Sequence, residues 1–127
     1  MKVLALDYGS ARTGVAVSDP SGTLARPLCV VERAGTAAGL ARLRELVQEE
    51  GAERVVVGLP LTLRGTRGEQ ARETEGFVES LRAAVDIPIE TFDERFTTTL
   101  AGPGPDDDAR AAAHLLSSYL EWSSRRS

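Results

Sequence analysis

The sequence contains one cysteine and no apolar run that approaches the length of a membrane span. The single cysteine, Cys29, excludes a disulfide within the chain, and its apolar neighbours indicate a small hydrophobic side chain on a strand. The N-terminus also lacks the charged and then apolar pattern of a signal peptide. We therefore expect a cytoplasmic protein that does not interact with a membrane.

An excess of positive charge is also missing, because the formal net charge is -4. A basic surface over the whole protein is thus excluded, and any contact with nucleic acid must be local and sensitive to salt. The cations are nearly all arginine, which suits bidentate phosphate contacts, although a biased genome composition produces the same excess. With 127 residues, 42% of them hydrophobic, the chain fits one domain over residues 1–127.

Apolar periodicity predicts three strands in a meander, followed by helix, strand, helix, strand and helix. The continuous run Val55–Val57 indicates a central strand that is covered on both faces. Right-handed crossovers then give an α/β fold, a five-stranded mixed sheet with helices on both faces and the first strand at its centre. This is the layout of the ribonuclease H-like fold. Strands are expected at residues 3–7, 13–18, 23–32, 54–58 and 87–92. Helices are expected at 36–50, after Gly68, and from Asp106–Asp108, which open the last one.

Acidic residues are predicted to meet at the carboxyl edge of the parallel strands, where open α/β sheets bind ligands. Asp7 ends the first strand, Asp93 and Glu94 follow the last, and Asp108 opens the final helix. Ionised carboxylates repel one another, so their convergence requires either a bound divalent cation or raised carboxyl pKa values. Their hard oxygen ligands favour Mg²⁺ or Mn²⁺. Two such ions would support hydrolysis of a phosphodiester bond. The spacing alone is weak evidence, because Asp is a common turn residue and 19 acids place some together by chance.

Three segments, in order along nearly the whole chain, resemble the signatures of one family. They are Leu6–Gly9 continuing to Gly14–Pro20, Val56–Leu61 with Gly65–Ala71, and Asp93–Thr98. The sequence resembles the YqgF family, also called RuvX, described as Holliday junction resolvases and as nucleases that mature the 5′ end of pre-16S ribosomal RNA. The resemblance implies a two-metal-ion endonuclease that cleaves structured nucleic acid, either pre-16S rRNA or branched DNA.

The resemblance also implies roles for individual residues. It gives Asp7 as the first metal ligand, Asp93 or Glu94 as the second carboxylate, and Asp108 as the third. Asp108 matches the family's acid by its position before the paired alanines Ala111-Ala112. The short segment before the helix leaves Asp107 as an alternative. The candidates for binding the nucleic-acid backbone are Gly9, Arg12, Arg67, Gln70 and Arg95. For Arg95, an ion pair with a neighbouring acid is an equally good interpretation.

The chain departs from the family between Thr99 and Asp106, where it has only Leu-Ala-Gly-Pro-Gly-Pro. Other members usually carry a lysine- and arginine-rich segment there. Its loss slightly favours an alternative, a non-catalytic nucleic-acid-binding module of the same fold in transcription or ribosome biogenesis. Sugar kinases and actin-like ATPases begin similarly but need two such domains. The sequence does not separate DNA from RNA substrates, and it leaves a homodimer open because junction resolvases need paired active sites.

Overall fold

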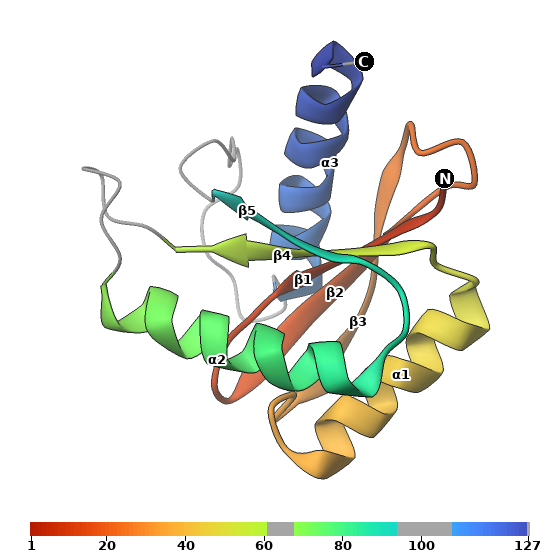
Figure 1. Ribbon diagram of the computed structural model, residues 1–127. Helices are drawn as coiled ribbons and strands as arrows, with labels where there is room; N and C mark the ends of the chain where they lie inside the picture. The colour runs from red at the N-terminus through yellow and green to blue at the C-terminus, as the bar shows by residue number, and fades with distance from the viewer. Residues whose placement is uncertain (61–67, 94–107, 127) are drawn as a thin grey trace.

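The computed structural model describes residues 1–60, 68–93 and 108–126, and the elements expected from the sequence are present there (Figure 1). Their bounds differ from the expected ones by no more than a residue or two. The elements are β1 (Val3–Asp7), β2 (Arg12–Ser18), β3 (Ala25–Glu32), α1 (Ala37–Glu50), β4 (Arg54–Leu59), α2 (Glu69–Ala84), β5 (Ile89–Asp93) and α3 (Asp108–Arg126). Within the described residues, none of the helices is long and apolar enough to cross a membrane.

The described strands form one mixed sheet in the order β3-β2-β1-β4-β5. β1 pairs with β2 in antiparallel fashion and with β4 in parallel, so Leu6 lies beside both Val15 and Val57. β5 continues the parallel side by pairing with β4. The predicted central position of the first strand is therefore confirmed, and Asp7 ends this strand in the middle of the sheet.

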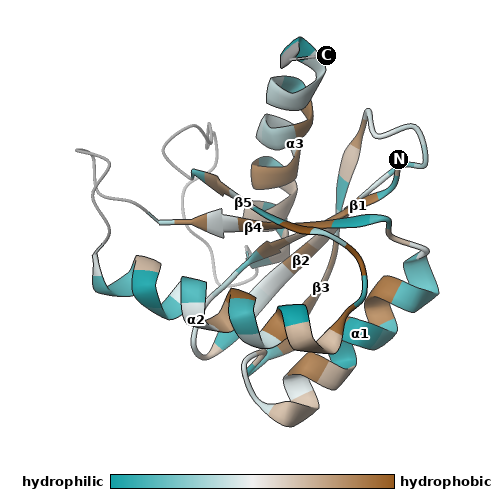
Figure 2. Cartoon of the chain, in the orientation of Figure 1, coloured by the Kyte–Doolittle hydropathy of each residue, from teal (hydrophilic) through white to brown (hydrophobic). Residues whose placement is uncertain are grey.

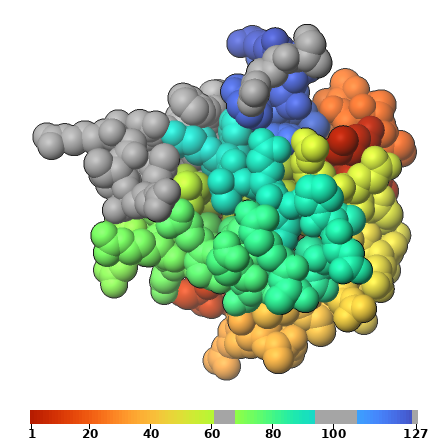
Figure 3. Space-filling model, in the orientation of Figure 1, coloured from red at the N-terminus to blue at the C-terminus, as the bar shows by residue number. Residues whose placement is uncertain are grey.

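Helices cover both faces of the sheet, as predicted (Figure 1). Leu4 and Leu6 pack into the core under α1 and α2, whereas Ala5 packs into the core under α3. Successive strand residues point to opposite faces, so both faces of the central strands are apolar (Figure 2). In the space-filling view, the β1–β2 turn reaches the surface between α2 and the residues that precede α1 (Figure 3).

Local signals in the sequence explain the ends of α1 and the position of β3. Thr36 caps α1 through its Oγ1, which accepts a hydrogen bond of 3.1 Å from the amide of Gly39. Gly51 ends the helix in the left-handed conformation with φ of 66°, as its type predicts. Pro27 lies on β3, an edge strand, where proline is better tolerated than in the middle of a sheet. Cys29 lies half-buried on the same strand, and this burial raises the pKa of its thiol.

A buried tyrosine fixes the body of α3 against the parallel strands. The hydroxyl of Tyr119 accepts a hydrogen bond of 2.9 Å from Arg54 of β4 and donates one of 2.9 Å to Glu90 of β5. Its ring also meets that of Phe92 edge to face, with 5.6 Å between the centroids. Because these partners come from two strands, they fix this part of α3 over β4 and β5.

We predict that Tyr119→Phe lowers the free energy of unfolding by about 1–2 kcal/mol, because Arg54 and Glu90 lose a shared partner. Tyr8→Phe is the matched control, since no described residue forms a hydrogen bond with the Tyr8 hydroxyl. Urea unfolding of the two variants measures the difference. Equal stability of both variants would show that the Tyr119 hydroxyl contributes nothing to the fold.

Asp19 organises the loop that connects β2 to β3. Its carboxylate accepts a hydrogen bond from the Ser21 hydroxyl, and from the amides of Thr23 and Leu24 at 2.8 and 2.9 Å. These bonds, the one from Ser21 first, lower the pKa of Asp19 from 3.8 to about 2.

We expect an NMR titration of the Asp19 carboxyl group to give this pKa of about 2. Since the pKa is lowered in the folded state, the carboxylate stabilises the fold above its unfolded value of 3.8, and this stabilisation is lost as the pH falls toward 2. Asp19→Asn should therefore remove part of the change in melting temperature between pH 4 and pH 2. A measured pKa near 3.8 would contradict the hydrogen-bonded arrangement.

Candidate active site

Asp7 is followed by a tight and rigid turn between β1 and β2. A side chain at Gly9 would collide with the carbonyl of Arg12, so the turn requires glycine there. The Oγ1 atom of Thr13, which is fully buried, accepts a hydrogen bond from the amide of Gly9 at 3.4 Å and donates one to its carbonyl at 3.3 Å. The amide of Gly9 is thus engaged within the turn, which holds Asp7 at the carboxyl end of the central strand.

A second glycine brings the start of α3 onto the same part of the sheet. Gly14 lies directly beside Asp7 in the pairing of β1 with β2. A Cβ atom at Gly14 would overlap the carbonyl of Asp108, so only glycine allows this approach. The structure therefore places the acids of the first strand and of the last helix on either side of Gly14.

Arg12 contacts one of these acids directly. Its Nε lies 3.2 Å from Oδ2 of Asp108, and the two side chains are 54% and 32% exposed. An exposed pair of this kind contributes little to stability, and an arginine held this way can exchange the carboxylate for a phosphate. A residue predicted to bind nucleic acid thus lies next to a predicted metal ligand.

Asp93 is placed differently from Asp7 and Asp108. β4 lies between β1 and β5, so two strand spacings, roughly 10 Å, separate the backbones of Asp7 and Asp93. Phe92 packs under α3, so alternation puts Asp93 on the other face, with Ile89. In residues 1–60, 68–93 and 108–126, no group of three or more acids, histidines or cysteines is arranged to hold a metal ion. The predicted residues Glu94, Arg67, Arg95 and Asp107 lie outside the described residues.

A hollow of about 380 Å³ opens between the β1–β2 turn and the start of α2. Gln70, predicted to bind nucleic acid, faces this hollow together with Asp7. Glu73 and Thr74 also line it, and the sequence analysis did not single them out. Their spacing from Gln70, three and four residues, marks one face of a helix and is the signal that could have found them. The hollow is lined by Asp7, Tyr8, Gly9, Ser10, Pro60, Gln70, Glu73 and Thr74.

Tyr8 forms one wall of this hollow. Its ring stacks on that of Phe77 in α2, with 4.3 Å between the centroids and 17° between the planes. Burial of the hydroxyl, and then the charge of Glu73, raise the pKa of Tyr8 above its usual value of 10. Tyr8 therefore stays neutral at physiological pH and can donate a hydrogen bond.

The described acids fit a hard divalent cation. Mg²⁺ is usually held by one or two carboxylates, and water and substrate phosphates complete its octahedral shell. Asp7 and Asp108 can supply those carboxylates from either side of Gly14. Arg12 neutralises part of the charge of Asp108.

Residues 1–122 match the family described as "RuvX: Holliday junction resolvase". The chain belongs to the RuvX family. A relative from Rubrobacter xylanophilus is called "Putative pre-16S rRNA nuclease". It is 47% identical over an alignment of 131 residues, gaps included, and the alignment covers 94% of this chain and 92% of the relative. A relative of the same name from Chloroflexus aggregans is 44% identical with the same coverage. For one from Chloroflexus aurantiacus, the match is 46% identical and spans 78% of this chain and only 65% of the relative.

Solved structures of resolvases share the fold of this RuvX protein. The RuvC protein of Thermus thermophilus in complex with a Holliday junction substrate superposes with a TM-score of 0.65 and 19% identity, over 98% of this chain and 96% of that one. Fowlpox virus resolvase in complex with Holliday junction DNA superposes with a TM-score of 0.56 and 11% identity, over 97% of this chain and 99% of that one. At these identities the likeness concerns the fold, and it confirms the predicted ribonuclease H-like α/β architecture.

We predict that Gly14→Ala destabilises this RuvX protein by about 3 kcal/mol, because the added methyl group meets backbone atoms that cannot rotate away. Gly76→Ala is the control, because its methyl group would meet no atom within 4 Å and Ala favours a helix by about 0.5–1 kcal/mol. Thermal or urea unfolding compares the two variants. A Gly14→Ala protein as stable as the wild type would show that α3 does not depend on this contact.

Proposed function

We propose that this protein is a metal-dependent nuclease that hydrolyses phosphodiester bonds in structured nucleic acid. The observation that carries the proposal is that Asp7 and Asp108 both lie next to Gly14, at the carboxyl edge of the central strand. Membership of the RuvX family and the names of the relatives support a nuclease. Residues 1–127 would act as one nuclease domain.

In the proposed mechanism, Asp7 and Asp108 hold Mg²⁺ or Mn²⁺. When bound, a pair of such ions supplies an activated water and stabilises the leaving oxygen of the phosphodiester. We assign the second carboxylate to Glu94 and not to Asp93, because Asp93 lies on the face of the sheet away from α3.

The residues around the acids would bind and orient the substrate. Arg12 would exchange its contact with Asp108 for a substrate phosphate, since its guanidinium is half exposed and already beside the acids. The amide of Gln70 would bind the nucleic-acid backbone from the side of α2. Gly9 would allow a strand to approach the turn closely, and Arg67 and Arg95 remain proposed backbone contacts from their motifs in the sequence.

We propose maturation of the 5′ end of pre-16S rRNA, resolution of Holliday junctions, or both, as the reaction. The relatives' names support the first substrate, and the family description supports the second. Junction cleavage would need two active sites, which a homodimer would supply. A non-catalytic nucleic-acid-binding protein is the second candidate, favoured by the lack of lysine and arginine between Thr99 and Asp106.

We predict that Asp7→Asn and Asp108→Asn each reduce cleavage by about a hundredfold or more, because each removes a metal-binding charge. Asp93→Asn and Asp107→Asn should retain most of the activity, whereas Glu94→Gln should not. Single-turnover cleavage of a pre-16S rRNA fragment and of a four-way DNA junction, with Mg²⁺ or Mn²⁺, measures the rates.

Glu45→Gln serves as the control, because it removes one acidic charge at an exposed site on α1. Cleavage that survives Asp7→Asn would remove Asp7 from the mechanism. A wild-type protein that binds both substrates but cleaves neither with either metal would instead support the non-catalytic candidate.

A further inference from the structure

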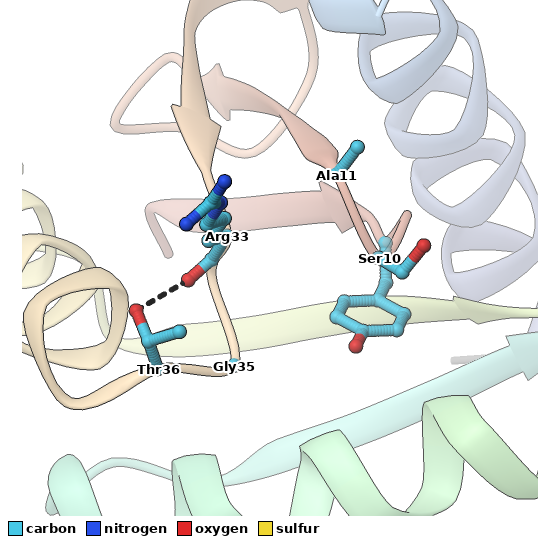
Figure 4. Close-up of a pocket in the computed structure, with 6 residues that line it drawn as sticks. Ser10, Ala11, Arg33, Gly35 and Thr36 are labelled. Carbon is cyan, nitrogen blue, oxygen red and sulfur yellow. Dashed lines mark hydrogen bonds between the residues drawn. The ribbon is translucent and has the colours of Figure 1, made fainter.

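A second hollow, of about 520 Å³, lies on the other side of Tyr8. It opens between the β1–β2 turn and the residues that connect β3 to α1 (Figure 4). It shares Tyr8 and Ser10 with the hollow that contains Asp7, so the two are neighbours along the surface. Its described lining is Tyr8, Ser10, Ala11, Arg33, Gly35 and Thr36.

The two hollows carry opposite charge. Asp7 and Glu73 line the first, whereas the described lining of the second contains Arg33 and no acid. The guanidinium of Arg33 is exposed and forms no ion pair within the described part of the chain. The hydroxyls of Ser10 and Tyr8 likewise lack a hydrogen-bond partner among the described residues. A guanidinium and two hydroxyls are donors that suit the oxygens of a phosphate.

The backbone holds Arg33 in a conformation that an arginine seldom adopts. Its φ is 47°, in the left-handed region, which costs stability for any residue with a Cβ atom. Its amide donates a hydrogen bond of 3.0 Å to the carbonyl of Ala11, and its carbonyl accepts from the amide of Thr36 at 3.0 Å and from Oγ1 at 2.7 Å (Figure 4). A Cβ atom at Gly39 would collide with the Arg33 carbonyl, so α1 also packs closely against it. Arg33 is thus fixed to the same turn that carries Asp7.

We propose that this second hollow binds a phosphate of the nucleic-acid substrate that flanks the phosphate being cleaved. Arg33 is the main contact, and the hydroxyls of Ser10 and Tyr8 complete the site. The inference rests on the proposed nuclease function, because it assumes a strand that continues from the acidic hollow past Tyr8. A strand of nucleic acid supplies phosphates on both sides of the cleaved bond, and a protein with a net charge of -4 must bind them through local cations.

Three variants test the role of Arg33. Arg33→Gln removes the charge, and Arg33→Gly removes the side chain while relieving the left-handed backbone. Arg44→Gln is the control, an exposed arginine on α1 that has no ion-pair partner within the described residues. Binding of a four-way DNA junction and of a pre-16S rRNA fragment is measured without divalent metal, at several salt concentrations, and cleavage kinetics follow with Mg²⁺ or Mn²⁺.

Both Arg33 variants should bind the cleaved substrate about tenfold more weakly, with a salt slope lower by about one. KM should rise while kcat stays near that of the wild type, since Arg33 contacts a phosphate away from the reacting bond. Arg33→Gly should melt at the wild-type temperature or above it, which a merely structural arginine would not allow. Arg44→Gln should match the wild type throughout.

Wild-type affinity in both Arg33 variants, with cleavage intact, would overturn this inference and leave the nuclease function standing. A loss of affinity matched by a loss of melting temperature in Arg33→Gly would also overturn it, because it would show a structural role. A wild-type protein that binds neither nucleic acid would reject the proposed function and this inference together.

Discussion

The close approach of Gly14 to the backbone of Asp108 determines where the first and last parts of the chain meet. The contact sets only one end of α3. Tyr119, more than two turns further along the helix, sets the other by its hydrogen bonds to Arg54 and Glu90. A helix held at two points has a defined direction, so backbone packing and the partly buried hydrogen bonds of Tyr119 together determine where Asp108 lies. The acids of the site are therefore placed by the core, and not by their own interactions.

Packing of this kind opposes electrostatics at the site. Asp7 and Asp108 are both brought next to Gly14, so two acids lie in the same part of the sheet. Arg12 offsets part of this negative charge with a contact of 3.2 Å to Asp108. Because this pair is half exposed, it is weak enough to be replaced. In the proposed function, a substrate phosphate and a metal ion would take over its two partners.

Most of the fold could be predicted from the sequence, because its signals are local. Apolar residues at a period of two or of 3.6 predict the strands and helices. Proline at position 27 predicts an edge strand, and glycine at position 51 predicts the end of a helix. Asp7 and Asp108 could be proposed as metal ligands for a similar reason, since each directly ends or begins an element. The choice between Asp93 and Glu94 was harder, because it depends on which face of the sheet α3 covers.

Other parts of the site could not be predicted, since they arise from contacts between distant segments. Glu73 lies on a predicted helix, but only the docking of α2 brings it beside Asp7. Arg33 precedes a predicted helix and carries no motif. Its left-handed backbone and its bond to Ala11 exist only when the connection before α1 packs against the β1–β2 turn. Neither composition nor periodicity contains that information.

The separation of charge across Tyr8 would answer a difficulty that the proposed nuclease function raises. The carboxylates needed to hold a cation repel the phosphates that must come close to it, and a net charge of -4 adds to this repulsion. Placing Arg33 beyond the aromatic wall gives the flanking phosphate a cation that Asp7 and Glu73 do not neutralise. Burial and Glu73 raise the pKa of Tyr8, so the wall itself stays uncharged and can donate a hydrogen bond to either side. The nucleic-acid strand would then be bound at its flanking phosphate by Arg33, while the metal held by the acids would bind the phosphate being cleaved.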